Sequence, residues 1–176
     1  YSDRSYKVIS YGQGRNFTYS NSLEPGGPES FGGVILAPGA LTDLWTKTFV
    51  ADGASVYSGQ DWTNFGFEKL YSATDIVDAA FKISATGTSE LYLSSWGKGL
   101  IKLEGISDPS FADTTGFFNT TNTGGVLKGV GGNASDLRTG GITFDENGTL
   151  WGVQSLVSTP LYSIDEEGNF SAYSLS

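Results

Sequence analysis

Short runs in which hydrophobic and polar residues alternate follow one another along the middle of the chain. The clearest run, IVDAAFKIS, places Val77, Ala79, Phe81 and Ile83 on one side and polar residues on the other. A period of two is typical of a half-buried β-strand. Two further strand-like runs, LYLSSW and LIKLEG, follow across a polar turn and a glycine turn. The pattern therefore predicts a three-strand antiparallel meander over residues 75–105.

The same order of short strands returns toward the C-terminus. The runs GGITFD, TLWGVQS, LYSID and FSAYSL are separated by turn residues, and Asn147-Gly148 is a strong hairpin signal. An earlier segment, ASVYSGQDWTNF (54–65), matches PLYSIDEEGNFSAY (160–173) in its order of strand, acidic turn, aromatic residue and strand. A period of roughly 40–60 residues with four short strands in each unit is typical of β-propeller blades.

We therefore predict an all-β fold: a β-propeller fragment of about three to four blades, each a four-stranded antiparallel meander, with residues 1–176 forming one partial propeller. In the first 40 residues, YKVISYG and NFTYS read as strands of the first blade. The predicted blade-like units cover residues of about 1–45, 46–74, 75–137 and 138–176, and the third unit includes a long polar loop over 106–137.

So few blades do not close an ordinary propeller, because closed propellers have about four to eight. Three arrangements of the blades remain possible from the sequence: an open arc, a four-bladed remnant, or a pairing with a second copy. Unpaired blade edges and uncovered apolar faces favour self-association.

The composition agrees with a strand-rich fold. The chain has 176 residues with 25 glycines and 14% aromatic residues, and only 16% of its residues are charged. Charged residues make up about 25% of an average domain. The chain starts at Tyr1 and contains no Met, so we expect it to be a piece of a longer protein. It contains no apolar run of transmembrane length.

The charge and the missing residue types exclude several classes of function. The net charge of −9 argues against nucleic acid and against an anionic membrane surface as partners. The chain has neither His nor Cys. Serine and cysteine triads with histidine, thiol catalysis, disulfides and zinc–thiolate sites are therefore excluded within it. Catalysis here would depend on carboxylates, Tyr, Lys or Ser.

Several segments resemble one family of repeats. DIVDAAFKISATGTSELYLSSWGKGLIKL resembles the blade motif of PorZ-type proteins from Bacteroidetes, and it is similar to the wider group of two-component-regulator propeller repeats. VYSGQDWTNF resembles the strand pair that precedes this motif, and GGITFDENGTLWGVQSLVSTPLYSIDEEGNFSAYSL resembles the blade that follows it. The resemblance covers residues of about 50–175.

The resemblance implies a role that the residues alone do not. PorZ-like proteins have two propellers and a C-terminal domain, belong to the type IX secretion apparatus at the cell surface, and are linked to the attachment of anionic lipopolysaccharide to cargo. The regulator relatives use similar propellers as periplasmic sensors of glycan fragments. The chain departs from the full pattern, because it contains no second propeller, sorting domain or transmembrane helix, and Phe170 stands where Trp is common.

The tryptophans are the candidate ligand-binding residues. Trp62, Trp96 and Trp151 recur at blade positions, where large aromatic residues usually pack between neighbouring blades. The alternative role is a platform on which a sugar ring stacks. Trp45 lies in the less regular segment ALTDLWTKTF and is the tryptophan that we expect to be exposed. We therefore predict Trp45 and Trp96 as ligand-binding residues.

The acidic residues do not form a recognisable catalytic or metal-binding motif. Asp145-Glu146-Asn147-Gly148 and DEEG (165–168) invite a calcium site, but the alternating acidic pattern of a calcium loop is incomplete, so hairpin turns are favoured. Glycoside hydrolysis needs two carboxylates across one bond, and the spacing brings no two candidates together. The candidates are Asp75, Asp78, Asp113 and Asp136.

The sequence thus predicts a non-catalytic binding and assembly module with no cofactor and no metal, the propeller portion of a PorZ-like cell-surface component of type IX secretion. The expected location is the bacterial cell surface, with the periplasm as the alternative. The expected partners are surface polysaccharide, secretion-system proteins or a second copy, without nucleic acid or membrane insertion. The alternative functions are a glycan-sensing propeller of a hybrid two-component regulator and a propeller glycosidase.

Overall fold

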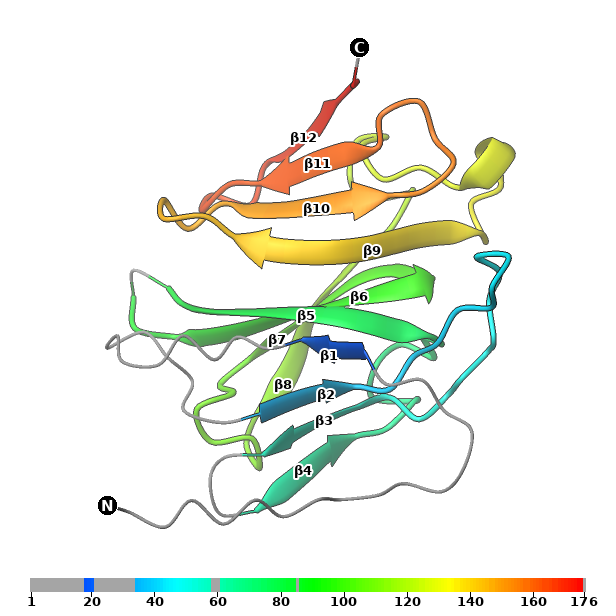
Figure 1. Cartoon of the computed structure of the whole chain (residues 1–176). Helices are drawn as coiled ribbons and strands as arrows, with labels where there is room; N and C mark the ends of the chain where they lie inside the picture. The colour runs from blue at the N-terminus through cyan, green and yellow to red at the C-terminus, as the bar shows by residue number, and fades with distance from the viewer. Residues whose placement is uncertain (1–17, 21–33, 58–60, 85, 176) are drawn as a thin grey trace, which may run out of the picture.

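The structure is a computed structural model that describes residues 18–20, 34–57, 61–84 and 86–175. The strand predicted in YKVISYG lies outside the described residues. The described residues form twelve strands and one short 3₁₀ helix, η1, at Val130–Gly132. The strands fall into three groups of four that follow one another along the chain (Figure 1).

Each group forms an antiparallel meander, which we name the first, second and third sheet. The first sheet contains β1 (Thr18–Ser20), β2 (Val34–Ala37), β3 (Ala54–Tyr57) and β4 (Trp62–Phe65). The second sheet contains β5 (Ile76–Ile83), β6 (Ser89–Gly97), β7 (Gly99–Glu104) and β8 (Asp113–Phe118). The third sheet contains β9 (Leu137–Phe144), β10 (Leu150–Gln154), β11 (Leu161–Ile164) and β12 (Phe170–Tyr173).

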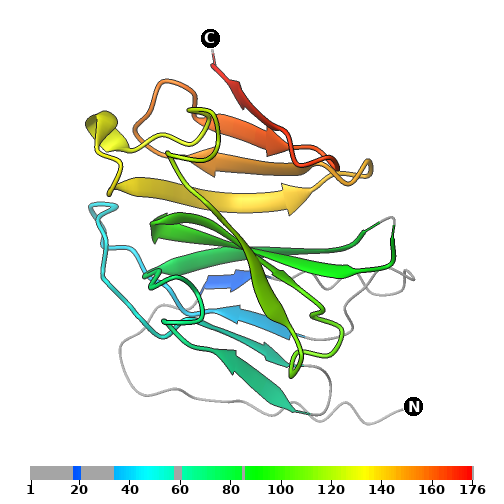
Figure 2. The same cartoon turned by 180° about the vertical axis from the view of Figure 1, so that it is seen from behind.

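The three sheets are stacked as successive layers, as the two opposite views show (Figures 1 and 2). The second and third sheets are also joined at one corner, where Trp96 pairs with Arg138 and Gly97 pairs with Leu137. Elsewhere their strands belong to separate meanders. The prediction of an all-β fold built from four-stranded antiparallel meanders, a propeller fragment, is confirmed.

Two predicted boundaries differ from the observed ones. The boundary between residues 45 and 46 falls inside the first sheet, because β2 and β3 pair with each other across the long connection 38–53. The predicted loop 106–137 contains β8, which pairs with β7. Both features are hard to read from the chain. The connection is longer than an ordinary hairpin loop, and the β8 sequence, DTTGFF, has no apolar alternation.

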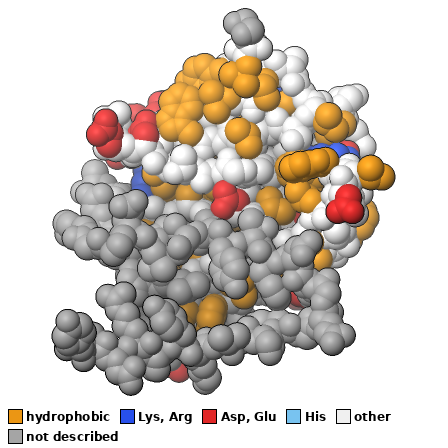
Figure 3. Space-filling model, viewed as in Figure 1, with side chains coloured by type: hydrophobic (Ala, Val, Ile, Leu, Met, Phe, Trp, Pro, Cys, Tyr) orange, Lys and Arg blue, Asp and Glu red, His pale blue; other side chains and the backbone are white. Residues whose placement is uncertain are grey.

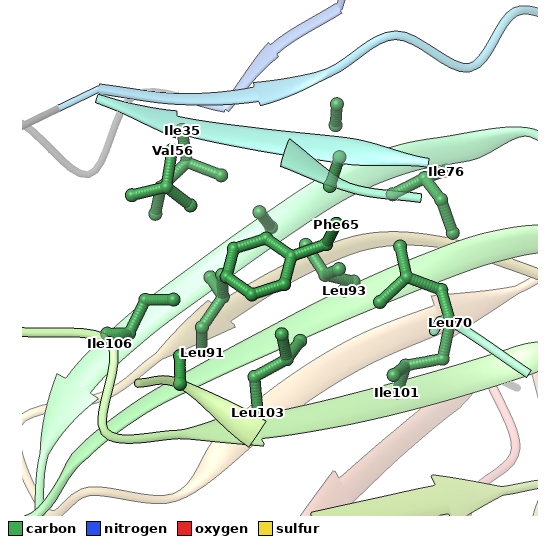
Figure 4. Packing of buried hydrophobic residues seen from close by; sticks show 14 of the residues in the cluster. Ile35, Val56, Phe65, Leu70, Ile76, Leu91, Leu93, Ile101, Leu103 and Ile106 are labelled. Carbon is green, nitrogen blue, oxygen red and sulfur yellow. The ribbon is translucent and has the colours of Figure 1, made fainter. Parts of the chain in front are cut away.

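The sheets are held together by two hydrophobic clusters. The cluster between the first and second sheets contains Ile35, Val56 and Phe65 from one side and Leu91 and Leu103 from the other (Figure 4). The cluster between the second and third sheets contains, among others, Tyr92, Leu100, Ile142, Leu150 and Tyr162. The second sheet therefore contributes alternate side chains of its strands to both clusters, whereas the first and third sheets each contribute to one.

Strand β6 shows why the second sheet lies at the centre of the molecule. All of its residues are buried, from Ser89 to Gly97. Leu91 and Leu93 belong to the first cluster, whereas Tyr92 between them belongs to the second. A strand that is covered on both faces loses the simple pattern of buried and exposed positions. Among the described residues, no helix has the length and the apolar character needed to cross a membrane.

Candidate functional site

The connection between β2 and β3, residues 38–53, forms a narrow projecting loop. Leu41 and Lys47 make an isolated antiparallel bridge at its base. Between them, the Trp45 N–H donates to the Thr42 carbonyl at 2.8 Å and the Thr46 N–H donates to Thr42 Oγ1 at 3.1 Å. These bonds close a tight turn because the short Thr42 side chain caps the backbone locally. The turn fixes the position of Trp45.

Asp75 holds the second half of this loop in place. Its Oδ1 accepts hydrogen bonds from Thr48 Oγ1 at 2.6 Å and from the Val50 N–H at 2.9 Å. Its Oδ2 accepts from the N–H groups of Thr48 at 3.2 Å and Phe49 at 2.9 Å. The Asp75 side chain is fully buried, and charge-assisted hydrogen bonds of this kind are the strong ones. Asp75 therefore shapes the loop from beneath.

The loop contains two aromatic residues in a backbone conformation that is costly for them. Trp45 has φ = 57° and Phe49 has φ = 60°, both in the left-handed region. Each such residue costs about 1–3 kcal/mol and persists only where surrounding contacts enforce it. Both side chains are nevertheless exposed, Trp45 at 65% and Phe49 at 70%. Strained residues cluster at functional sites, so this loop is a candidate binding site.

Trp96 and Arg138 enforce the position of Trp45. The Trp45 carbonyl oxygen accepts one hydrogen bond from Trp96 Nε1 at 3.1 Å and another from Arg138 Nη1 at 3.0 Å. The two indole rings are in contact, with centroids 6.4 Å apart and an interplanar angle of 45°. The structure thus brings together the two tryptophans that the sequence predicted as ligand-binding residues, although they come from different sheets.

The two tryptophans have different surroundings. Trp96, in β6, is only 4% exposed, and its backbone N–H donates to the Asp75 carbonyl at 2.9 Å. It packs over Gly140, where an added Cβ would lie 3.3 Å from the indole ring. Trp96 is therefore a buried support, and Trp45 is the ring that a ligand can reach. The exposure predicted for Trp45 is confirmed.

An open groove of about 520 Å³ begins at Thr46, the residue that follows Trp45 in the chain, and the aromatic ring that lines it is that of Phe49. Its walls come from the 38–53 loop and from the segment that leads into β9, and they contain Thr46, Lys47, Phe49, Asn133, Ser135, Asp136 and Arg138. We call this groove together with the Trp45 ring the Trp45 groove. Hydroxyl, amide, carboxylate and cationic groups beside an aromatic face can both stack on a ligand ring and hydrogen-bond to its polar groups.

Three of the residues that line the Trp45 groove, Lys47, Asp136 and Arg138, form a salt-bridged triad. Lys47 Nζ lies 2.9 Å from Asp136 Oδ1, and Arg138 Nη2 lies 3.1 Å from Asp136 Oδ2. Partial burial acts to raise the pKa of Asp136, but the hydrogen bonds and charges of Arg138 and Lys47 outweigh it and hold the pKa below its usual range. Asp136 is therefore ionised at neutral pH. It ties the 38–53 loop to the third sheet.

The other two tryptophans lie on outward-facing sides of the sheets. Trp62 is 39% exposed and its ring is 5.3 Å from that of Tyr57. Trp151 is half-buried and lies 5.3 Å from the ring of Tyr173. Among the described residues, neither Trp62 nor Trp151 packs between two sheets, so the predicted interblade packing is not seen there.

The acidic hairpin at Asp145 is a structural turn. Asp145 Oδ1 accepts from the N–H groups of Asn147 at 2.9 Å and Thr149 at 3.0 Å, and Oδ2 accepts from Trp151 Nε1 at 2.9 Å. The hydrogen bond from the Trp151 indole lowers the pKa of Asp145 and outweighs an opposing effect of desolvation, and the two backbone bonds lower the pKa further. Asp165 caps the DEEG turn in the same way through Asn169.

The four carboxylates weighed for glycoside hydrolysis serve separate structural contacts. Asp75 holds the loop, and Asp136 is bound to Lys47 and Arg138. Asp78 Oδ2 accepts from the Ile142 N–H at 2.8 Å, which links β5 to β9. Asp113 is exposed at the start of β8. Within the described ranges, no group of three or more acidic side chains could hold a metal ion.

Sequence reasoning missed several residues of the Trp45 groove. Lys47, Phe49 and Arg138 carried no motif, and the contact between the 38–53 loop and the start of β9 joins distant parts of the chain. One signal was available: ALTDLWTKTF places several large apolar residues in a segment without strand periodicity. Leu44 in this segment is 84% exposed.

The comparisons with known proteins identify a similar fold. No protein-family model matches the chain, and no curated protein matches it. The structure is similar to part of PorZ, described as an essential bacterial surface component of the type-IX secretion system of Porphyromonas gingivalis. The TM-score is 0.68 and the sequence identity is 21%, over 83% of this chain and 19% of the PorZ chain. The predicted resemblance to PorZ is thus confirmed at the level of the fold.

Proposed function

We propose that this chain is a non-catalytic binding and assembly module, the propeller portion of a PorZ-like component of bacterial type IX secretion that is exported to the cell surface. The fold similarity to PorZ, at a TM-score of 0.68, supports this assignment. The chain spans 19% of the PorZ chain, so it would supply one part of a larger machine.

The observation that carries the binding function is the exposed, strained and doubly anchored Trp45. A loop that merely connects two strands has no need to present a tryptophan at 65% exposure. Two hydrogen bonds to its carbonyl and the buried Trp96 ring preorganise it before any ligand arrives. Preorganisation lowers the entropic cost of binding.

The chemistry of the Trp45 groove suits a surface polysaccharide. The C–H face of a pyranose ring stacks on an aromatic ring, while its hydroxyl groups hydrogen-bond to polar side chains of the lining such as Thr46, Asn133 and Ser135. The groove is open rather than enclosed, which suits a segment of a long chain. The same chemistry would serve a glycan-sensing propeller, so the secretion role and the ligand are tested separately.

The absence of catalysis is part of this proposal. Asp75 and Asp136 already use both carboxylate oxygens in hydrogen bonds or ion pairs with other elements. Asp78 joins two strands through a backbone N–H. A hydrolytic pair would need a proton donor and a nucleophile on opposite sides of one glycosidic bond. Incubation with a panel of oligosaccharides should therefore leave every substrate intact, and release of reducing ends would contradict the proposal.

Two experiments test the proposed function. Immobilised chain is titrated with lipopolysaccharide and with a panel of neutral and acidic polysaccharides; saturable binding to at least one supports the binding role, and binding to none overturns it. In the native host, the gene is deleted and secreted cargo is measured on the cell surface. Loss of surface cargo supports the type IX role, whereas unchanged cargo with intact polysaccharide binding points to the glycan-sensing alternative.

A further inference from the structure

The connections that follow β8 and β10 lie side by side at one end of the third sheet (Figures 1 and 2). They are residues 119–136, which contain η1, and residues 155–160. A second groove, of about 530 Å³, is lined by residues of both connections. We call it the Lys128 groove; its lining includes Thr120, Leu127, Lys128, Leu156, Val157 and Ser158.

The Lys128 groove is separate from the Trp45 groove, although one segment borders both. Gly131, Gly132 and Ala134 line the Lys128 groove, whereas Asn133 and Ser135 line the Trp45 groove. No described residue lines both. An added Cβ on Gly131 or Gly132 would meet no atom within 4 Å, so the backbone of the segment borders open space there. The two grooves can therefore hold different ligands.

Gln154 holds the two walls of the Lys128 groove together. Its buried side chain accepts from the Lys128 N–H at 2.8 Å and donates to the Thr159 carbonyl oxygen at 2.9 Å. One amide group thus joins the two connections. Within the first connection, Thr123 Oγ1 accepts from the Leu127 N–H at 3.2 Å. The walls are in place before a ligand arrives, which lowers the entropic cost of binding.

The charge of the Lys128 groove favours an anionic group. Lys128 is the one charged residue among the described residues that line it. Its Nζ lies 3.4 Å from Ser158 Oγ, and within the described part of the chain Lys128 forms no ion pair. Asp136 ends the same connection, but Lys47 and Arg138 already neutralise it. A ligand anion at Lys128 would therefore meet a cation that no described carboxylate holds.

Leu156 and Val157 give the groove an aliphatic side next to this cation. Leu156 is 69% exposed and has φ = 58°, and such strained residues cluster at functional sites. Hydrophobic side chains also gather over the third sheet, whose second and third strands this connection joins (Figure 3). None of the described lining residues is aromatic. The Lys128 groove therefore suits an aliphatic side chain rather than a stacked sugar ring.

We infer that the Lys128 groove binds the C-terminus of a peptide whose last residue is aliphatic. The terminal carboxylate accepts a charge-assisted hydrogen bond from Lys128 Nζ and a second bond from the Ser158 hydroxyl. The last side chain contacts Leu156 and Val157. A C-terminal residue carries its carboxylate and its side chain on one Cα, and here Ser158 directly follows Val157.

Capture of a terminal carboxylate is a recurring mode of peptide recognition. An internal acidic residue of a peptide would bring the same charge, so the test includes it as an alternative. The inference does not depend on the proposed polysaccharide or on secretion, because the Lys128 groove contains none of the described residues of the Trp45 groove.

The test uses hexapeptides that are immobilised through their N-termini and end in each amino acid, with either a free carboxylate or a carboxamide. The chain should bind free-acid peptides that end in leucine, isoleucine or valine. The matching carboxamides should bind at least about tenfold more weakly, the scale of one hydrogen bond to a charged group. Equal binding of acid and carboxamide, or binding to no peptide, overturns the inference. Carboxamides that bind as tightly through an internal acidic residue also overturn it.

A pair of lysine variants locates the site. Lys128→Met removes the charge and keeps a long side chain, so affinity for the best peptide should fall at least about tenfold. Lys98→Met is the matched control, because Lys98 is exposed between β6 and β7 and does not line the groove. Circular dichroism checks that both variants are folded. Wild-type affinity in Lys128→Met, or an equal loss in both variants, overturns the assignment.

Leu156→Gly separates a binding role from a packing role. Glycine adopts φ = 58° without strain, so the urea midpoint of unfolding should not fall. Affinity for the best peptide should fall by roughly tenfold, because the aliphatic contact is lost. A lower midpoint with unchanged affinity would make Leu156 a packing residue and would overturn the inference.

Discussion

The connection from the second to the third strand differs sharply among the three sheets, although the sheets themselves are alike. In the first sheet it is the loop 38–53, in the second it is Lys98 alone, and in the third it is the turn 155–160. The long loop holds Trp45 and Phe49 at positive φ, and the intermediate turn holds Leu156 at φ = 58°. The four-stranded sheets repeat the same architecture, whereas the connections between their second and third strands differ in length and in the side chains that they expose.

The short connection supports the long one. Trp96 and Gly97 end β6 just before Lys98, and Gly99 at φ = 113° begins β7. An added Cβ on Gly99 would lie 2.3 Å from the Phe118 carbonyl oxygen, so only glycine fits this tight reversal. The reversal fixes Trp96 at the corner where the second and third sheets join. Its indole N–H then reaches the loop of the first sheet.

The largest expected effect is on the free energy of unfolding, and it should differ between Trp96 and Trp45. Trp96→Ala should lower the free energy of unfolding by about 3–5 kcal/mol, because it removes a buried ring and a hydrogen bond. Trp45→Ala should lower it by less than about 1 kcal/mol, because the Trp45 ring is mostly exposed and its backbone carbonyl is retained. Urea unfolding of both variants measures the difference. Equal losses would show that Trp45 is a packing residue.

The next largest effect concerns the residue that holds the long loop. Asp75→Ala should cost about 2–3 kcal/mol, since it leaves the N–H groups of Thr48, Phe49 and Val50 without their acceptor. Asp145→Ala is the matched control in a solvent-exposed turn and should lower the unfolding midpoint less. Amide exchange should rise throughout residues 48–50 in the Asp75 variant. Unchanged protection there would contradict the role given to Asp75.

The connection of the third sheet has its own clamp, which should matter less. The Gln154 side chain accepts from the Lys128 N–H at 2.8 Å and donates to the carbonyls of Val126 at 2.8 Å and Thr159 at 2.9 Å. Gln154→Ala should cost about 1–2 kcal/mol, less than Asp75→Ala, because the lost bonds involve an uncharged amide. The same urea experiment ranks the two. A larger loss for Gln154 would reverse our ordering of the two clamps.

The smallest effect is a dependence on pH at the Trp45 groove. The pKa of Asp136 is lowered in the folded chain, so its ion pairs with Lys47 and Arg138 add stability above the unfolded pKa of about 3.9. This contribution is lost as the pH falls through the folded value. Wild type should exceed Asp136→Asn in free energy of unfolding by less than about 1 kcal/mol at pH 7, and this difference should shrink as the pH falls below the unfolded pKa. A constant difference across this range would exclude the ion pairs as its cause.

The scaffold was far easier to predict from the sequence than the groove. The alternation in β5 correctly places Ala79 and Phe81 on the side that faces the first sheet, but a β-bulge between Ile76 and Asp78 puts Ile76 in that cluster in place of Val77. The contact of Trp45 with Trp96 joins two sheets through a carbonyl oxygen and leaves no trace in local spacing. Asp75 was weighed as a catalytic carboxylate because a sequence does not show that four hydrogen bonds from one loop converge on it.

The role of the Trp45 groove is tested most directly by comparing three affinities. The wild-type chain, Trp45→Ala and Trp62→Ala are titrated by calorimetry with the polysaccharide that binds the wild-type chain most tightly. Trp62 is the matched control, a partly exposed tryptophan in β4 that does not line the groove. We expect Trp45→Ala to lose at least about tenfold in affinity, the scale of one lost aromatic stacking contact, and Trp62→Ala to bind like the wild type. Wild-type affinity in Trp45→Ala would contradict the assignment of this groove as the binding site.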